Sequence, residues 1–336
     1  MVTEQATGED GPPRCRVGVV IINYRTPDLT RQCVESVAGS LEAADARIAL
    51  VDNFSDDGSA EALQDWLDRD LADKSWRARI HFVKSPTNTG FSGGNNLGFR
   101  ALDADYYLLL NSDAYLRDGA LQRLVSVFEA EDRVGAVGPR LEDPDSAAQV
   151  SCFRFFHPFS ELIDGARTGV VSKLFSSFQI AQPLSDQRAD YDWVSFACIM
   201  ISRTAYEAAG PMDEGYFMYF EDADYCRALR AAGFRTVYAP EARAVHLRGG
   251  SSPVKKMHAA LKRPPAYYYA SRARYFRKHF GVLGLVSANL LWLLGRVVAH
   301  ARRLLGHRAP PVCEKQARDI WINWRDPLGG ASRPVS

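Results

Sequence analysis

The chain has 336 residues, of which 46% are hydrophobic, and its formal net charge is +1. This length allows one large domain or two with a sizeable core, and the near-neutral charge argues against a nucleic-acid-binding protein that depends on phosphate contacts. The six cysteines are scattered without Cys-x-x-Cys spacing, which disfavours a structural zinc site. Residues 1–14 are polar and acidic with Gly and Pro, so we expect a flexible tail without a secretion signal, and hence a reduced, cytoplasmic protein.

Apolar runs alternate with segments of helical spacing along the first part of the chain. The apolar runs, which we interpret as strands, are 16–22, 47–51, 79–83, 106–110 and 134–138. Helical spacing is present over 29–41, 60–70, 95–102 and 119–129. This alternation predicts βαβ units and a mostly parallel sheet, so the fold class is α/β.

The pattern breaks down between 142 and 191, where we expect irregular structure beside the acceptor side of a cleft. Regular structure returns after this region. Strands are predicted over 192–201, 235–240 and 244–246, and helices over 203–209 and 225–232.

Polar side chains follow three of the predicted strands. They are Asn23, Asp52 with Asn53, and Asn111-Ser112-Asp113. Because open α/β sheets bind ligands at the carboxyl ends of their strands, these residues suggest a shared crevice for a nucleotide. Asp52 can accept hydrogen bonds from a base or a ribose, and the Asp113 carboxylate can hold a hard divalent cation that binds a diphosphate. The alternatives are a turn residue for Asp52 and a helix cap for Asp113.

A glycine-rich segment covers 88–98 and includes Gly90 and Asn95. It lacks the glycine spacing of a dinucleotide fingerprint and the Gly-Lys-Ser/Thr of a P-loop. Its glycines would let the backbone approach a ligand closely, but from the segment alone an ordinary loop with a helix cap is the favoured interpretation.

Three carboxylates, Glu221, Asp222 and Asp224, open the predicted helix that ends near residue 232. The helix dipole favours acidic residues there, but three exceed what one cap needs, so one of them can be a general base. Trp193 offers a flat apolar face for a sugar ring, with a buried core tryptophan as the alternative. His246 ends a short apolar piece, where a structural role and a ligand role are both open.

The stretch 280–295 has no charged residue and is flanked by basic ones. It is short for a membrane span. Basic flanks with leucines and Trp292 are typical of a helix lying in a bilayer interface. A helical hairpin packed on the rest of the chain or on a second subunit is the alternative.

Taken in order, these motifs resemble those of the family 2 inverting glycosyltransferases, in particular the rhamnosyltransferase-like branch. The matching pieces are 20–24, 51–59, 88–96, 109–113, 212–214 with 220–224, and 246–252. The resemblance implies a glycosyltransferase A type nucleotide-sugar-binding domain over 15–255. Residues 256–336 would form a helical extension that contacts a membrane or another copy of the chain.

The resemblance also implies roles for individual residues. Asp222 matches the catalytic base, and Asp113 with His246 matches a site for Mg²⁺ or Mn²⁺. The donor nucleotide would contact Asn23, Asp52, Asn53, Gly90, Asn95, Asn111 and Asp113. The acceptor or the sugar would contact Trp193, Glu221 and Asp224. Two residues depart from the family pattern: Asn111 replaces a carboxylate of the metal motif, and Phe196 stands where relatives often have glycine.

The implied function is metal-dependent transfer of a sugar, with dTDP-rhamnose as the expected donor. The acceptor would be a glycan or a polyprenyl-linked precursor at the inner face of the cell membrane. Three alternatives are a UDP-hexose donor on the same fold, an inactive module that only binds nucleotide sugars, and a nicotinamide-dependent oxidoreductase. The glycine spacing argues against the last of these.

Overall fold

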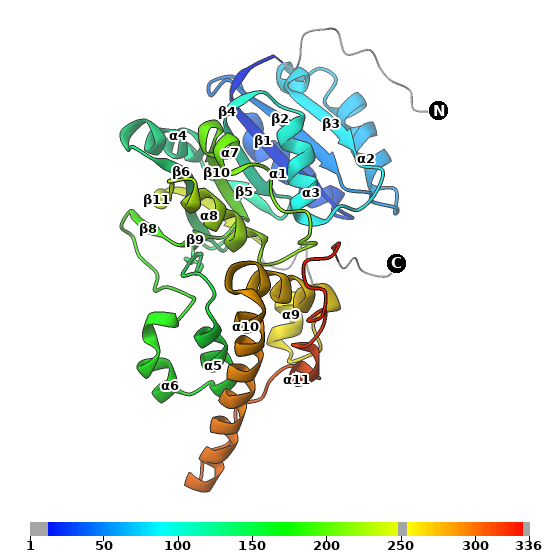
Figure 1. The fold of residues 1–336 in the computed structure, drawn as a ribbon. Coiled ribbons are helices and arrows are strands. Elements are labelled where there is room, and N and C mark those ends of the chain that lie inside the picture. The colour runs from blue at the N-terminus through cyan, green and yellow to red at the C-terminus, as the bar shows by residue number, and fades with distance from the viewer. Residues whose placement is uncertain (1–12, 248–253, 332–336) are drawn as a thin grey trace.

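The computed structural model describes residues 13–247 and 254–331. It shows an α/β body above a helical module, from which one long helix extends (Figure 1). The expected tail, apart from residues 13 and 14, and residues 248–252 of the last matching motif lie outside the described residues.

Within these residues, nine strands form one mixed sheet in the order β3-β2-β1-β4-β10-β6-β11-β5, with β8 paired to β11. Their bounds are β1 Cys15–Asn23, β2 Ala46–Asp52, β3 Ile80–Lys84, β4 Ala104–Asn111, β5 Ala114–Leu116, β6 Val134–Glu142, β8 Ala189–Tyr191, β10 Cys198–Ser202 and β11 Arg235–His246. Strands β1 to β4 run parallel, as do β6 and β11, whereas β10 is antiparallel to both of its neighbours. The expected α/β class with a mostly parallel central sheet is confirmed.

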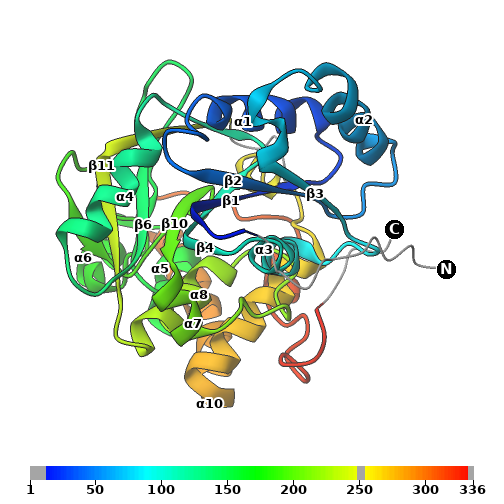
Figure 2. The ribbon, with the colours of Figure 1, turned by 90° about the horizontal axis from the view of Figure 1, so that it is seen from above.

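Helices cover both faces of this sheet. The helices of the body are α1 Pro27–Ala38, α2 Ser59–Asp65, α3 Gly90–Arg100, α4 Ala120–Ala130, α7 Arg203–Ala209 and α8 Glu221–Ala231. Seen from above, α1 and α2 lie on one side of the sheet and α3, α7 and α8 on the other (Figure 2).

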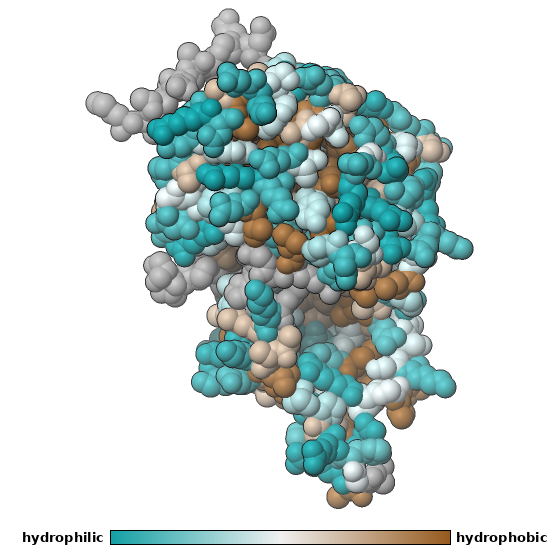
Figure 3. Space-filling view, turned by 180° about the vertical axis from the view of Figure 1, so that it is seen from behind, coloured by the Kyte–Doolittle hydropathy of each residue, from teal (hydrophilic) through white to brown (hydrophobic). Residues whose placement is uncertain are grey.

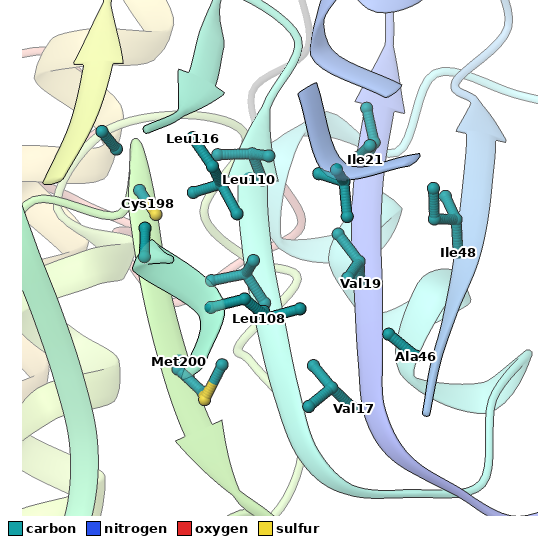
Figure 4. Packing of buried hydrophobic residues seen from close by; sticks show 14 of the residues in the cluster. Val17, Val19, Ile21, Ala46, Ile48, Leu108, Leu110, Leu116, Cys198 and Met200 are labelled. Carbon is teal, nitrogen blue, oxygen red and sulfur yellow. The ribbon is translucent and has the colours of Figure 1, made fainter. Parts of the chain in front are cut away.

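Alternation along the strands explains these two layers, because successive side chains of a strand point to opposite faces. Val19 and Ile21 of β1 pack with Leu108 and Leu110 of β4 on the α1 face (Figure 4). Val20, between them in sequence, belongs to the core on the α3 face. The central strands are therefore apolar on both sides and appear in the sequence as continuous hydrophobic runs.

The helical module joins two distant parts of the chain. Its helices are α5 Pro158–Ala166, α6 Gly169–Leu174, α9 Val254–Ala259, α10 Ala266–Ala301 and α11 Gln316–Asp319. Helices α5 and α10 approach so closely that a Cβ on Gly165 would lie 2.2 Å from the carbonyl oxygen of Trp292. Buried Arg272 of α10 bonds Glu161 of α5 across this contact (2.9 Å), and it also donates to Asn289 within α10 (2.7 Å). One face of α10 therefore packs on its own chain, as one of the two alternatives for this segment predicted.

Four boundaries differ from the sequence expectations. Residues 90–94, expected as loop, are the first turns of α3, and the expected strand 192–201 is interrupted between β9 (Trp193–Val194, paired with β7, Cys152–Phe153) and β10. The two short strands expected over 235–246 form one strand, whose register shifts between Ala239 and Arg243. The segment expected to be irregular contains α5 and α6.

Candidate active site

A cavity of about 220 Å³ lies at the carboxyl end of β4. It is lined by Phe91, Asn111, Asp113, Phe153, Trp193, Ser195, Phe196, Ala197, Met218, Tyr219, Glu221, Asp222 and His246. Six of the residues predicted for the site are among these: Asn111, Asp113, Trp193, Glu221, Asp222 and His246. Segments more than a hundred residues apart in the chain therefore meet around one space.

Backbone pairing sets the position of Asp113 beside His246. Strand β5 starts directly after Asp113 and pairs antiparallel with the end of β11, so that Ala114 lies opposite His246. The amide of Leu247 donates to the carbonyl oxygen of Asp113 (2.8 Å). As a result His246 Nε2 lies 3.7 Å from Asp113 Oδ1, with both side chains buried.

One carboxylate and one imidazole fit a divalent cation that takes its other ligands from substrate oxygens and water. Within residues 13–247 and 254–331, no group of three His, Cys, Asp or Glu side chains is placed to hold a metal on its own. A cation at Asp113 and His246 would therefore depend on the substrate for part of its coordination.

The turn before α8 is held from two sides. Tyr219 (φ 73°) and Phe220 (φ 69°) are consecutive non-glycine residues in the left-handed region, which is costly unless the surroundings enforce it. The carbonyl oxygen of Phe217 accepts from the amide of Phe91 in α3 (2.8 Å), and that of Met218 accepts from Ser271 Oγ in α10 (3.0 Å). These contacts fix the start of α8, and with it Glu221 and Asp222.

The two carboxylates at the start of α8 have different surroundings. Glu221 is 7% exposed, and its burial, together with the neighbouring charge of Asp222, raises the pKa of Glu221 well above its usual range. Asp222 is less buried, and its Oδ1 accepts from the amide of Ala223 (2.8 Å). Adjacent carboxyls in such different environments hold their protons with different strength, and the buried Glu221 is shifted towards the neutral form.

Asp224 is placed away from the cavity. It accepts from the hydroxyl of Tyr216 (3.1 Å) and from Lys278 Nζ (2.8 Å), and its Oδ1 lies 2.7 Å from His279 Nε2. Lys278 also bonds Asp213 (2.9 Å). The structure therefore places Asp224 in an ion cluster that joins α8 to α10.

Asp213 should make the contribution of this ion cluster to the stability of the fold depend on pH. Burial acts to raise the pKa of Asp213, but hydrogen bonds from Arg274 and Lys278 outweigh it and lower the pKa to about 2. Because the folded pKa lies below the unfolded value of about 3.9, the stabilisation is complete above about pH 4 and is lost as the pH falls towards 2. We expect Asp213→Asn to lower the free energy of unfolding at pH 7 by about 2 kcal/mol, and the difference from wild type to shrink below pH 4.

Urea denaturation at pH 7, 4 and 3 measures this difference. Asp65→Asn is the control, since Asp65 is exposed and its ion pair with Arg69 (3.6 Å) is worth only a few tenths of a kcal/mol. An Asp213→Asn effect no larger than that of the control at pH 7 would contradict the prediction.

Asn23 and Asp52 lie side by side at the ends of β1 and β2. Asn23 Nδ2 donates to Asp52 Oδ1 (2.7 Å), and the amide of Ser55 donates to Asp52 Oδ2 (3.0 Å). Both side chains are buried, and neither lines the 220 Å³ cavity. Asn111 links this pair to the cavity, because it lies beside Ile22 on the neighbouring strand β4.

Asn53, Gly90 and Asn95 shape the start of α3. The Asn53 side chain accepts from the amide of Thr89 (3.0 Å) and donates to the carbonyl oxygen of Gly90 (2.9 Å). Gly90 has φ +69°, and a Cβ there would lie 2.2 Å from the carbonyl oxygen of Phe217. Asn95 Nδ2 donates to the carbonyl oxygen of Phe91 (3.0 Å). This glycine-rich segment thereby brings Phe91 to the cavity wall.

Aromatic side chains make up much of the wall of the 220 Å³ cavity. Trp193 stacks on Phe153 with ring centroids 4.1 Å apart, and its Nε1 donates to the carbonyl oxygen of Arg154 (2.9 Å). Phe196 packs edge-on to Tyr225 (6.3 Å) and fills space that a glycine would leave open. Phe153, Met218 and Tyr219 were missed at the sequence level because they come from segments without regular periodicity.

A second cavity, of about 350 Å³, adjoins the first. It shares Trp193, Tyr219 and Asp222 with the first cavity and is otherwise lined by Phe156, Phe220, Val254, His258 and Tyr268. Asp222 therefore lies where the two spaces meet. The last three of these residues belong to α9 and α10, so the C-terminal part of the chain builds one wall.

The fold is of the glycosyltransferase A type, and its carboxylates and histidine gather at the carboxyl edge of the sheet, where open α/β sheets bind ligands. Residues 18–168 match the family described as Glycosyl transferase family 2. The chain thus carries a family 2 glycosyltransferase domain and is a glycosyltransferase similar to the rhamnosyltransferases.

Two relatives illustrate this similarity. The chain is 26% identical over 238 residues to N-acetylglucosaminyl-diphospho-decaprenol L-rhamnosyltransferase of Mycobacterium tuberculosis, covering 65% of this chain and 73% of that protein. It is 25% identical over 164 residues to rhamnosyltransferase WbbL of Escherichia coli, covering 47% of this chain and 60% of that protein.

Two solved structures share the fold. GalNAc-T7, solved with UDP, GalNAc and Mn²⁺, has a TM-score of 0.56 at 15% identity over 78% of this chain and 48% of that one. The mannosyltransferase PcManGT of Pyrobaculum calidifontis, in complex with GDP-Man and Mn²⁺, has a TM-score of 0.55 at 16% identity over 90% of this chain and 80% of that one.

Proposed function

We propose that the protein is a metal-dependent inverting glycosyltransferase that moves L-rhamnose from dTDP-rhamnose to a hydroxyl of a glycan or polyprenyl-linked acceptor. One observation carries the proposal: a single cavity brings a carboxylate–imidazole pair, Asp113 and His246, together with the carboxylate of Asp222. Asp113 and His246 are suited to hold a cation for the leaving diphosphate, and Asp222 is suited to accept the proton of the attacking hydroxyl.

Asp113 and His246 are the residues that would hold Mg²⁺ or Mn²⁺. Mn²⁺ accepts an imidazole ligand more readily than Mg²⁺ does. When bound, the cation offsets the negative charge that develops on the diphosphate as the glycosidic bond breaks. The Mn²⁺ and nucleotides in the two structural neighbours support this assignment.

We assign the proton transfer to Asp222. Its carboxylate takes the proton of the acceptor hydroxyl while that oxygen attacks the anomeric carbon and the bond to the diphosphate breaks on the opposite side. This single displacement inverts the anomeric centre, and a positioned base contributes on the order of 10²–10⁴-fold. Burial raises the pKa of Glu221, which makes Asp222, the less buried carboxyl of the two, the better candidate for the base.

The donor nucleotide is assigned to the edge formed by β1, β2 and β4. Asn23, Asp52 and Asn111 end these strands: Asn23 lies opposite Asp52, Asn111 lies opposite Ile22, and Asn53 follows Asp52. The hydrogen bond from Asn23 to Asp52 helps to fix a polar surface there. The dTDP-rhamnose assignment is supported by the relatives that are named as rhamnosyltransferases.

The acceptor is assigned to the second cavity, because Asp222 opens onto it as well as onto the first. Aromatic walls such as Trp193, Phe156 and Tyr268 suit the apolar faces of a sugar ring. A polyprenyl-linked acceptor would place the reaction at the cytoplasmic side of a membrane. All six cysteines are unbonded and buried, which fits that compartment.

Donor hydrolysis tests the proposal without a known acceptor. We expect the purified protein to release dTDP from dTDP-rhamnose in the presence of Mn²⁺, with little release after chelation or from UDP-hexoses. Release from a UDP-hexose alone would correct the donor but keep the enzyme class. Nucleotide binding without turnover on any donor would support the inactive module, and the absence of binding would refute the nucleotide-sugar assignment.

A further inference from the structure

The second half of α10 carries a continuous apolar stripe on its outer face. After a break at Gly281 (φ 71°, ψ −170°), one row of exposed side chains follows alternating steps of four and three residues, while Val282 and His300 are exposed outside this row. The large ones in this row are Leu283 (81% exposed), Leu290 (54%), Leu294 (49%), Val297 (63%) and Leu304 (90%), the last in the 3₁₀ turn Arg302–Leu305 that follows α10. Ser287 and Ala301 fill the two remaining positions of this repeat. At 1.5 Å per residue the stripe is about 30 Å long.

The inner face of the same segment is already occupied. Leu285, Ala288 and Trp292 are buried, and Trp292 Nε1 donates to Asp164 Oδ2 in α5 (2.9 Å). Arg296 donates to the carbonyl oxygen of Gly165 (3.1 Å). By length and composition 266–304 could cross a membrane, but 39% of its most apolar window is buried inside the protein. Crossing would require α10 to leave α5, whereas lying on a surface would not.

The charges near the stripe distinguish between two possible binding partners, a second copy of the chain and a lipid bilayer. Residues 281–313 contain four arginines and no acidic residue. Arg303 and Arg308 are exposed and Arg302 is partly so, all of them close to the end of the stripe. If two copies paired through the stripe, their basic flanks would meet without the opposite charges that normally border a helical seam. A bilayer with anionic headgroups complements both the apolar stripe and the basic end.

We propose that the outer face of α10 and of the 3₁₀ turn after it, from Leu283 to Leu304, docks on the surface of an anionic lipid bilayer and lies in its interface. In the space-filling view from behind, apolar surface is present on the helical module below the body and at its tip (Figure 3). The first half of α10 supplies Tyr268 to the second cavity, so one helix connects that cavity to the lipid surface. The docking does not depend on which sugar is transferred.

Vesicle co-sedimentation of the full chain tests this proposal. The wild-type protein should bind phosphatidylcholine vesicles that contain phosphatidylglycerol, bind pure phosphatidylcholine vesicles much more weakly, and dissociate as salt is raised. The triple variant Leu290→Ser, Leu294→Ser, Val297→Ser should lose about a hundredfold or more in affinity, because three apolar side chains no longer enter the interface. Arg302→Gln with Arg303→Gln should lose roughly fivefold for each charge.

The matched control is Val150→Ser, Leu184→Ser, Leu328→Ser, at apolar positions that are 43%, 55% and 47% exposed elsewhere on the protein. It should bind anionic vesicles like the wild type. The proposal is overturned if the wild type does not bind anionic vesicles at low salt, or if the α10 variants bind as well as the control. It is also overturned if light scattering shows a dimer that the triple α10 variant converts to a monomer while vesicle binding is unchanged, since the stripe would then join two copies. Donor hydrolysis is measured in parallel, so that a failure of the membrane-docking proposal can be told apart from a failure of the proposed reaction.

Discussion

Asp222→Asn should lower the rate of sugar transfer by about 10²–10⁴-fold, because an amide cannot take the proton of the acceptor hydroxyl. Asn and Asp have nearly the same shape, and Asp222 Oδ1 accepts from the amide of Ala223, a bond that an amide oxygen can also accept. The start of α8 should therefore stay in place. We expect dTDP affinity, measured by calorimetry, to change by less than about twofold while turnover with acceptor falls.

Glu221→Gln is the matched control for this prediction. The two carboxyls are adjacent on the same helix turn and both line the cavity. Burial raises the pKa of Glu221 and so favours its neutral form, and a glutamine keeps the shape of that form. Its transfer rate should stay within about tenfold of the wild type. The assignment of the base would have to move to Glu221 if that variant lost transfer and Asp222→Asn kept it.

The sequence predicted the sheet well because its central strands are buried on both faces. Residues 106–110 form an uninterrupted apolar run, and β4 covers 104–111. The helix expected over 203–209 has those bounds in the structure, where the Ser202 side chain accepts from the amide of Ala205 at its start. Here the local pattern and the tertiary environment favour the same conformation.

The glycine-rich segment was harder to predict because distant residues decide its conformation. Four glycines between 90 and 98 lower helix propensity, so a loop was the expectation for its first part. The structure has helix there, with Asn53 bonded to Thr89 and Gly90, and with the backbone of Phe217 in the space beside Gly90. These partners lie more than thirty residues away and leave no periodic signal in the segment itself.

Within the site, helix geometry explains why Asp222 and Asp224 have separate surroundings. Two residues apart on a helix correspond to about 200° of rotation, so their side chains leave opposite faces. The two-residue spacing is enough to predict that Asp222 and Asp224 lie on different faces of the helix. It does not predict which residues bond to Asp224. Lys278 and His279 lie more than fifty residues further along the chain. His258 and Tyr268 were missed for the same reason, since no motif marks them as part of a cavity wall.

Asp113→Asn should abolish the dependence of donor hydrolysis on Mn²⁺ and lower its rate by at least about a hundredfold. Asp113 is 1% exposed and is the carboxylate nearest to His246, so the amide would leave the imidazole as the main protein ligand. Neutral ligands hold a hard divalent cation weakly. Calorimetric titration of Mn²⁺ in the presence of dTDP should show at least a tenfold loss of affinity.

Asp186→Asn is the control, because Asp186 is an 83% exposed carboxylate whose ion-pair partner is Arg140, outside the residues that line the cavity. It should bind Mn²⁺ and hydrolyse donor like the wild type. His246→Ala distinguishes a shared cation from a carboxylate acting alone, since a cation held by both residues predicts weaker Mn²⁺ binding in each variant. Unchanged Mn²⁺ affinity in Asp113→Asn would show that the cation is held elsewhere. Asp113 would then be a structural residue that fixes the pairing of β5 with β11, and the catalytic assignment would rest on Asp222 alone.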